Sequence, residues 1–150
     1  MRVVIQRVSK ASVIIEKQSV ANIKKGLLIL LGIEVEDTKE DALWLANKVS
    51  SLRVFADSQG IMNHSILDID GEVIVVSQFT LHAKTKKGNR PSYIKAAKSQ
   101  KAMFLYDQFK LNLSNAIEKE VRSGVFGADM QVSLINDGPV TIYIDTKNKE

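Results

Sequence analysis

The chain has 150 residues, of which 45% are hydrophobic and 25% are charged, as is usual for one globular domain. It contains no cysteine, which excludes disulfides, a thiolate nucleophile and cysteine-bound metal. The longest apolar run is far too short to span a membrane, and Arg7 and Lys10 interrupt the beginning of the chain, where a signal peptide would be apolar. We therefore expect one cytoplasmic domain over residues 1–150.

The net charge of +4 is unevenly distributed. From Val73 to Tyr106 there is no Asp or Glu, and the cations of this window are Lys84, Lys86, Lys87, Arg90, Lys95, Lys98 and Lys101. A face that carries only positive charge can bind phosphates, which makes nucleic acid a candidate partner. A solvated lysine-rich loop would show the same pattern, so charge alone leaves both readings open.

The first third of the chain predicts strands followed by a helix. Short runs rich in Val and Ile predict three strands, at residues 2–8, 11–16 and 18–23. The continuous apolar run "GLLILLGI", residues 26–33, fits a strand buried on both faces. Thr38 then marks the N-cap of a helix at about 39–52, because apolar residues recur there at helical spacing.

Later elements follow from turn residues and from periodicity. Asp70-Gly71 lies between two apolar runs and predicts a hairpin, and "EVIVVSQFTL" predicts a buried strand over 73–81. A polar loop, "HAKTKKGNRPS", then leads to a helix at about 99–120. Its expected buried residues are Met103, Tyr106, Phe109, Leu113 and Ile117.

The last part of the chain has two alternating segments, "MQVSLI" and "VTIYID", on either side of "NDGP". Four turn-forming residues between two runs of period two predict a final strand pair joined by a turn. The whole pattern predicts an α+β single domain with a mainly antiparallel, barrel-like sheet and two principal helices packed on it.

Polar residues appear where the strand over 73–81 emerges from the core, at Ser77, Gln78 and Thr80. In a regular strand Ser77 and His82 would point to opposite faces, and Thr80 and His82 would lie roughly 6–7 Å apart. That separation is too long for a nucleophile and its base, which disfavours a serine– or threonine–histidine mechanism. No phosphate loop, dinucleotide fingerprint or zinc signature is present either. The residues alone indicate a basic globular domain without a side-chain catalyst.

Three stretches carry a resemblance to a known family: "SQFTL" (77–81), "KKGNRPS" (86–92) and "NDGPVT" (136–141), with "SGVFGADM" (123–130) between the last two. In this order and near this spacing, they resemble the D-aminoacyl-tRNA deacylases, and the resemblance extends over the whole chain. The sequence departs from the family pattern at His82, where an aromatic residue is common, and at Asn89, where arginine is frequent. These departures affect local loop contacts.

The resemblance implies hydrolysis of the ester between a D-amino acid and the 3′ end of tRNA, and of glycine mischarged on alanine tRNA. It implies a homodimer with its pocket at the dimer interface and no cofactor or metal. It also implies a cis Gly138-Pro139 peptide that enters the partner's active site and rejects L-amino acids by steric clash. The residues alone would favour a tight turn with a trans proline here.

The family mechanism further implies roles for individual residues. The backbone N–H groups of Phe79 and Thr80 would stabilise the oxyanion, with Ser77 and Gln78 holding that backbone and the tRNA 2′-hydroxyl helping to activate water. A nucleophilic Thr80 is the second possibility. The residues expected around the substrate and its adenosine are Arg7, Phe126, Met130 and Asn136. The residues expected to contact tRNA phosphates are Lys84, Lys86, Lys87 and Arg90.

Two other functions remain as alternatives. A non-catalytic nucleic-acid-binding protein would use the basic stretch 84–101, but it would need neither "SQFTL" nor "NDGPVT". A hydrolase of small molecules would have no need for a face free of acidic residues.

Overall fold

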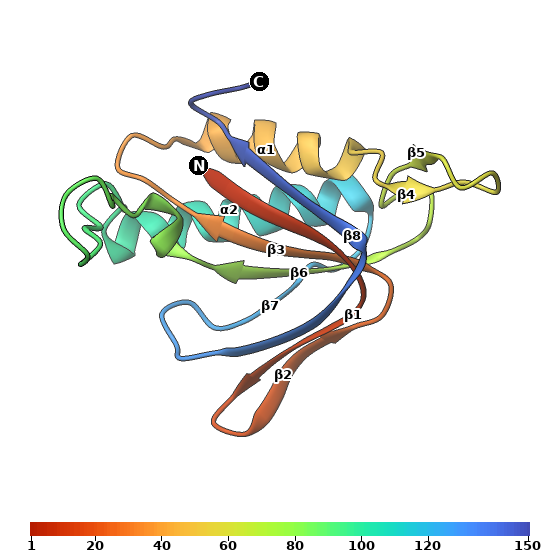
Figure 1. The fold of residues 1–150 in the computed structure, drawn as a ribbon, viewed down its shortest axis with the longest axis horizontal. Coiled ribbons are helices and arrows are strands. Elements are labelled where there is room, and N and C mark those ends of the chain that lie inside the picture. Colours follow the sequence, from red (N-terminus) through yellow and green to blue (C-terminus); the bar gives the residue numbers. More distant parts are fainter.

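A computed structural model describes residues 1–150 (Figure 1). Its larger sheet contains β1 (Arg2–Ile15), β2 (Gln18–Ile23), β3 (Gly26–Gly32), β6 (Glu72–Ser77), β7 (Arg122–Ser123) and β8 (Gln131–Asp145). A separate two-stranded sheet is formed by β4 (Phe55–Ala56) and β5 (Met62–His64). The helices are α1 (Lys39–Ser51) and α2 (Ser99–Ile117), with a short 3₁₀ helix, η1 (Phe79–His82).

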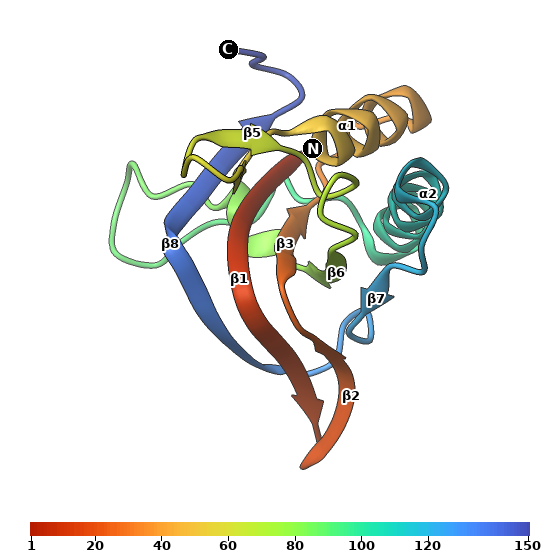
Figure 2. The same ribbon diagram turned by 90° about the vertical axis from the view of Figure 1, so that its right-hand side faces the viewer.

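The long strand β1 organises the sheet. One of its edges pairs with β8 over almost its whole length, while the other pairs with β3 near the start and with β2 near the end, all antiparallel. The pairs β3–β6 and β6–β7 are parallel. The strands curve into a nearly closed barrel-like surface (Figure 2), so the predicted α+β class and the barrel-like sheet are confirmed, with a parallel section added.

The two helices lie side by side on one side of the sheet, away from β8 (Figure 2). A core cluster of 23 buried residues includes side chains from both helices and from β1, β3 and β6, which fixes the helices to the sheet. The predicted buried face of α2 is confirmed for Tyr106, Phe109, Leu113 and Ile117. It is wrong for Met103, which is 46% exposed, because the inward position at this turn belongs to Ala102.

Several predicted boundaries differ from the structure. The strands predicted at 2–8 and 11–16 are one strand, β1, because pairing with β8 continues past irregularities in register. Asp70-Gly71 forms no hairpin: Gly71 N–H donates to the carbonyl oxygen of Ile66 at 3.0 Å, which closes a turn that leads into β6. The helix predicted to reach residue 120 ends at Ile117, since Glu118 adopts a left-handed conformation with φ of 51°.

The predicted final hairpin is also wrong. Both alternating segments belong to β8, and both pair with β1: Leu134 lies opposite Ala11, and Ile142 lies opposite Ile5. Between these paired segments, β1 contributes the single residue Arg7 while β8 contributes the four residues 137–140. The four residues must therefore leave the ladder, and we call this excursion the arch. A sequence pattern cannot distinguish an arch in one strand from a turn between two, because both need the same turn-forming residues.

Candidate active site

The first part of the site is the turn that follows β6. The strand ends at Ser77, although one more ladder bond forms, from Gln78 N–H to the carbonyl oxygen of Leu31 at 2.8 Å. The chain then turns into η1 and packs closely on β3 at Gly32. A Cβ atom at Gly32 would lie 2.9 Å from the carbonyl oxygen of Gln78, so this approach requires glycine.

The strand predicted over 73–81 is therefore wrong beyond Ser77, and the side-chain alternation inferred from it fails. The structure still argues against the rejected serine–histidine pair, for a different reason. His82 is buried, and neither of its ring nitrogens has a hydrogen-bond partner. It thus contacts neither Ser77 nor Thr80 as a base would.

The 3₁₀ turn leaves two backbone donors free. Leu81 N–H donates to the carbonyl oxygen of Gln78 at 3.2 Å, and Ala83 N–H donates to that of Thr80 at 3.0 Å. The first N–H groups of a helix have no acceptor within it, and here those of Phe79 and Thr80 have none elsewhere in the chain. Two adjacent free donors on a fixed turn can stabilise a developing oxyanion.

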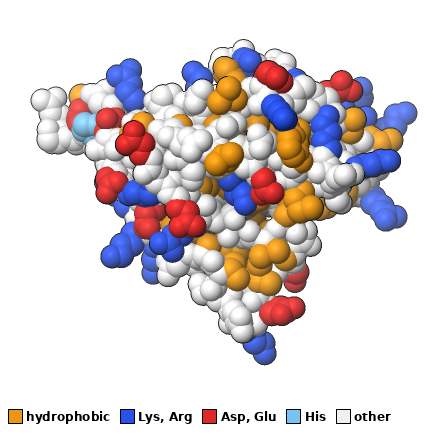
Figure 3. Space-filling view, turned by 180° about the vertical axis from the view of Figure 1, so that it is seen from behind, with side chains coloured by type: hydrophobic (Ala, Val, Ile, Leu, Met, Phe, Trp, Pro, Cys, Tyr) orange, Lys and Arg blue, Asp and Glu red, His pale blue; other side chains and the backbone are white.

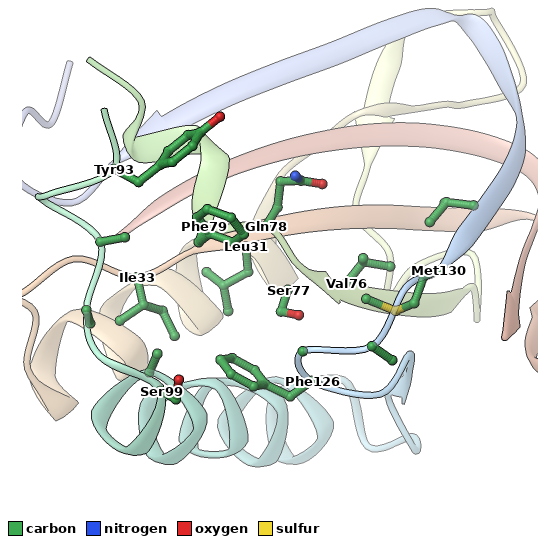
Figure 4. A pocket seen from close by; sticks show the side chains of 16 residues that line it. Leu31, Ile33, Val76, Ser77, Gln78, Phe79, Tyr93, Ser99, Phe126 and Met130 are labelled. Carbon is green, nitrogen blue, oxygen red and sulfur yellow. The ribbon is translucent and has the colours of Figure 1, made fainter. Parts of the chain in front are cut away.

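Beside this turn lies a cavity of about 580 Å³, in which 12 of the 16 lining residues are hydrophobic. Ser77 and Phe126 point toward one another across it, and Met130 lies at one end (Figure 4). Leu31 and Ile33 of the β3 region contribute apolar wall, and Ser99 lies at the beginning of α2. Such a mostly apolar cavity with a few polar groups at its edge suits a planar base better than an ion.

Aromatic contacts hold two of these residues in place. Phe79, 57% exposed, meets Tyr93 edge to face with ring centroids 5.0 Å apart. Phe126 meets Tyr106 in the same manner at 5.7 Å. The buried hydroxyl of Tyr106 donates to the carbonyl oxygen of Val75 at 2.8 Å, so it anchors Phe126 to β6. Sequence reasoning missed Tyr93, and it placed Tyr106 in the core without a role beside the cavity, because these roles depend on contacts that no local pattern reports.

Thr80 is half-buried and does not line the cavity. Its Oγ1 accepts a hydrogen bond of 2.5 Å from the side-chain amide of Gln78. This donor occupies a lone pair of the hydroxyl, and no base takes its proton. The arrangement stabilises the turn and does not activate Thr80 as a nucleophile.

The arch is braced from both sides by side chains of β1 and β8. Arg7 Nε donates to the carbonyl oxygen of Asp137 at 2.8 Å, and Arg7 Nη1 donates to that of Val54 at 2.6 Å. Asn136 Oδ1 accepts from Val140 N–H at 2.8 Å, which closes the base of the arch. Asn136 Nδ2 donates to Gln6 Oε1 at 3.0 Å. Gln6 is a bracing residue that sequence reasoning missed.

The tip of the arch is exposed and lies outside the cavity of its own chain. The peptide between Gly138 and Pro139 is cis, and Gly138 has φ of 133°, which disfavours any side chain. No residue beyond Val132 lines the cavity. The structure thus brings Ser77, Gln78, Phe79, Phe126 and Met130 together, and it groups Arg7 and Asn136 with the arch instead.

The predicted phosphate-binding residues lie in one exposed loop. Lys84 and Ser92 exchange backbone hydrogen bonds of 2.8 and 3.1 Å, which close the loop, and Lys86, Lys87 and Arg90 lie between them. None of these cations forms an ion pair. The loop lies at the left in Figure 1 and at the right in Figure 3, where several Lys and Arg side chains project.

No cluster of three or more His, Asp or Glu side chains is arranged to hold a metal ion. Neither helix has the length and apolar character needed to cross a bilayer.

Comparisons with known proteins show the family. A family model described as D-Tyr-tRNA(Tyr) deacylase matches residues 4–145. Proteins named D-aminoacyl-tRNA deacylase from Flavobacterium psychrophilum and Bacteroides fragilis are 62% and 61% identical over 150 residues, which is 100% of each chain. The barrel-like fold and these matches define the protein as a hydrolase. The chain belongs to the D-Tyr-tRNA(Tyr) deacylase family and is an enzyme.

Solved structures show the same architecture. The c-Myc DNA Unwinding Element Binding Protein matches with a TM-score of 0.90 and 38% identity, covering 97% of this chain and 98% of that one. A probable eukaryotic D-amino acid tRNA deacylase matches with a TM-score of 0.80, covering 95% and 97% of the two chains. The second is only 16% identical and supports the fold alone.

Proposed function

We propose that this enzyme hydrolyses the ester of D-aminoacyl-tRNA, and of glycyl-tRNA mischarged on alanine tRNA, to free tRNA and amino acid in the cytoplasm. The observation that carries the proposal is the pair of free N–H groups at Phe79 and Thr80 beside an apolar cavity. The terminal adenosine would enter the cavity between Ser77 and Phe126, near Met130. The scissile carbonyl would then lie at η1.

In the proposed reaction, water adds to the ester carbonyl carbon, and the N–H groups of Phe79 and Thr80 bind the oxyanion. One such donor contributes about 2.7–4 kcal/mol to transition-state stabilisation. No side chain near η1 is placed as a base, so the 2′-hydroxyl of the substrate would relay the proton of the water. Collapse of the intermediate breaks the bond to the 3′-oxygen, which leaves as the hydroxyl of tRNA.

Selectivity for D-amino acids would come from the arch of a second copy of the chain. The tip at Gly138 and Pro139 is exposed and absent from its own cavity, which supports a role in a neighbouring copy. If the tip lies against the substrate α-carbon, an L side chain collides with it and a D side chain points away. Glycine has no side chain to collide, which accounts for its acceptance. Rejection by clash needs no catalytic side chain.

The assignment is tested by incubating the protein with matched D- and L-aminoacyl-tRNA and with glycyl-tRNA, and by following release of the amino acid. We expect the D and glycyl esters to be cleaved and the L ester to be largely spared. Equal rates on the D and L esters would contradict rejection by the arch. No cleavage of any of them would contradict the deacylase assignment itself.

The basic loop should contribute to tRNA binding through phosphates. Replacing Lys86, Lys87 and Arg90 together by Ala should weaken tRNA binding and flatten its salt dependence. Each lost phosphate contact lowers the slope of log K against log salt concentration by about 0.7–0.9. Filter binding or fluorescence anisotropy over a salt series measures this slope.

A matched control replaces three exposed lysines elsewhere, Lys17, Lys24 and Lys48, and removes the same formal charge. A general loss of net charge would affect both triple variants alike. An unchanged slope in the loop variant would identify the loop as merely solvated.

A second candidate function is binding of nucleic acid without catalysis. It is favoured by the unpaired cations of the loop and by the similarity to the c-Myc DNA Unwinding Element Binding Protein, whose name describes DNA binding. This function predicts tight tRNA or DNA binding with no ester cleavage. The D- and L-aminoacyl-tRNA assay therefore distinguishes it from the first.

A further inference from the structure

His82 is an unusual residue in this structure. It closes η1, is 1% exposed, and has no hydrogen-bond partner for either ring nitrogen. No other buried side chain has polar atoms without a partner. A buried polar group without a partner destabilises the fold, because it loses its hydrogen bonds to water and forms none within the protein. The proposed reaction makes no direct use of this ring.

The ring lies where η1 meets the rest of the fold. A Cβ atom at Gly32 would be 3.1 Å from the His82 ring carbon Cδ2, so the ring packs directly on β3. The backbone of Gly32 lies close enough to the ring to raise the pKa of His82, although neither ring nitrogen makes a hydrogen bond of good geometry. Next to it, Arg2 Nη1 donates to the carbonyl oxygen of Leu81 at 3.0 Å. Movement of the ring must therefore displace the same four-residue turn that presents the N–H groups of Phe79 and Thr80.

We propose that His82 is a positioning residue for these two N–H groups, and that its protonation in mildly acidic solution loosens η1 from β3 and slows deacylation. The inference rests on the proposed role of η1 as the oxyanion-binding turn. It adds a built-in pH response to the site, which the reaction itself does not require.

The charged groups around the ring come from several elements. Burial lowers the pKa of His82 below its ordinary value, and the positive charges of Arg2 on β1 and of the Met1 amine act in the same direction. The backbone of Gly32 and, more weakly, the carboxylate of Glu34 just after β3 favour the imidazolium and raise the pKa of His82. Unlike the other two nearby carboxylates, Glu34 has no ion pair. Those two are Asp37, which binds the Met1 amine, and Asp145, which binds Arg2.

The direction of the pH effect follows from this balance. In the folded state the ring stays neutral at a pH where a histidine in the unfolded chain, with its ordinary pKa of 6.5, already binds a proton. Between the two pKa values the unfolded or loosened state binds more protons, so acid favours it. The packing of η1 is therefore complete above about pH 6.5 and is lost as the pH falls through the pKa of the buried ring.

The first test compares the pH dependence of wild type and His82→Phe, with each rate divided by that enzyme's own rate at about pH 8 on the same D-aminoacyl-tRNA. Any intrinsic pH dependence of the ester is common to both enzymes and cancels in their ratio. We expect the ratio of wild type to variant to fall about tenfold for each pH unit below the midpoint of His82, because the ratio of protonated to neutral ring rises tenfold. Parallel profiles would overturn the proposal.

The second test needs no variant at position 82 and no catalysis. The chain has two histidines, so the imidazole nitrogens of His82 and His64 can be followed by NMR in wild type and assigned with His64→Gln. We expect His82 to titrate below the ordinary histidine pKa of 6.5, and the amide signals of Phe79 and Thr80 to shift with it. If His82 titrates and the signals of these amides do not change, the proposal that His82 positions the two N–H groups is rejected, even if the deacylase assignment holds. Glu34→Gln should lower the pKa of His82 further, because it removes a negative charge that favours the imidazolium. An unchanged pKa of His82 in this variant would show that Glu34 does not act on the ring.

Discussion

Phe79→Pro should lose about 10²–10³-fold in kcat on D-aminoacyl-tRNA, the loss typical of removing one oxyanion donor. Phe79 is the first residue of η1, and its N–H has no acceptor in the chain, so proline removes a donor that contributes nothing to the fold. Proline is tolerated at the first position of a helix. Gln78 before it has ψ of 76°, outside the helical region that a following proline excludes.

The matched control is Phe79→Ala, which also removes the ring but keeps the N–H. It loses the edge-to-face contact with Tyr93, a contact of about 0.5–1.5 kcal/mol, so its activity should fall by no more than roughly tenfold. Equal losses in the two variants would assign the effect to the ring. Thermal unfolding of both variants, followed by circular dichroism, excludes a folding defect as the cause.

Thr80→Ala distinguishes backbone from side-chain catalysis in the same turn. Alanine keeps the N–H and removes only the hydroxyl that accepts from Gln78. Substantial activity should therefore remain, and no acyl-enzyme should form. An acyl adduct trapped on Thr80 would show that the hydroxyl is the nucleophile.

Mixed dimers should recover D-selective activity, which neither parent variant has. Ser77→Phe fills the cavity opposite Phe126 and should abolish cleavage. Gly138→Ala places a Cβ atom 2.5 Å from Arg7 Nη2, at a φ of 133° that alanine rarely adopts, and so displaces the arch. If each cavity uses the arch of the other chain, one site of the mixed dimer has both defects and the other has neither. Activity that is selective for D-amino acids should then return toward half of wild type per mixed dimer.

The experiment uses two affinity tags to isolate the mixed dimer after co-refolding. If cavity and arch came from one chain, each chain would have one defect, and selective activity would not return. Gly60→Ala is the control for the glycine substitution, since its φ of 80° is also positive but no atom lies within 4 Å of an added Cβ. That variant should keep wild-type selectivity.

Local patterns determined most of the elements. Helical spacing located α1 to within one residue of its end, because its inward residues Ala42, Leu45, Ala46 and Val49 must all meet the same core. Alternation located both halves of β8, and the continuous apolar run located β3, which is buried on both faces. Each of these signals depends only on neighbours in the chain and on which side of the element is buried.

The residues of the proposed site were found in the sequence because "SQFTL" and "NDGPVT" resemble a family, and their geometry came only from the tertiary structure. The sequence could not show that the chain leaves β6 at Gln78, because the cause is close packing on Gly32, far away in the chain. Nor could it show that His82 is buried without a partner.

The arch is the clearest case of what folding alone decided. Asn136 to Pro139 have the composition of a hairpin turn, and the residue preferences of turns are satisfied both by a hairpin and by an arch within one strand. The outcome is decided by β1, which is long enough to pair with both halves of β8 and carries Arg7 opposite the gap. Strand pairing across more than a hundred residues overrides the local preference, because the ladder hydrogen bonds and the buried faces of both halves are gained only in that register.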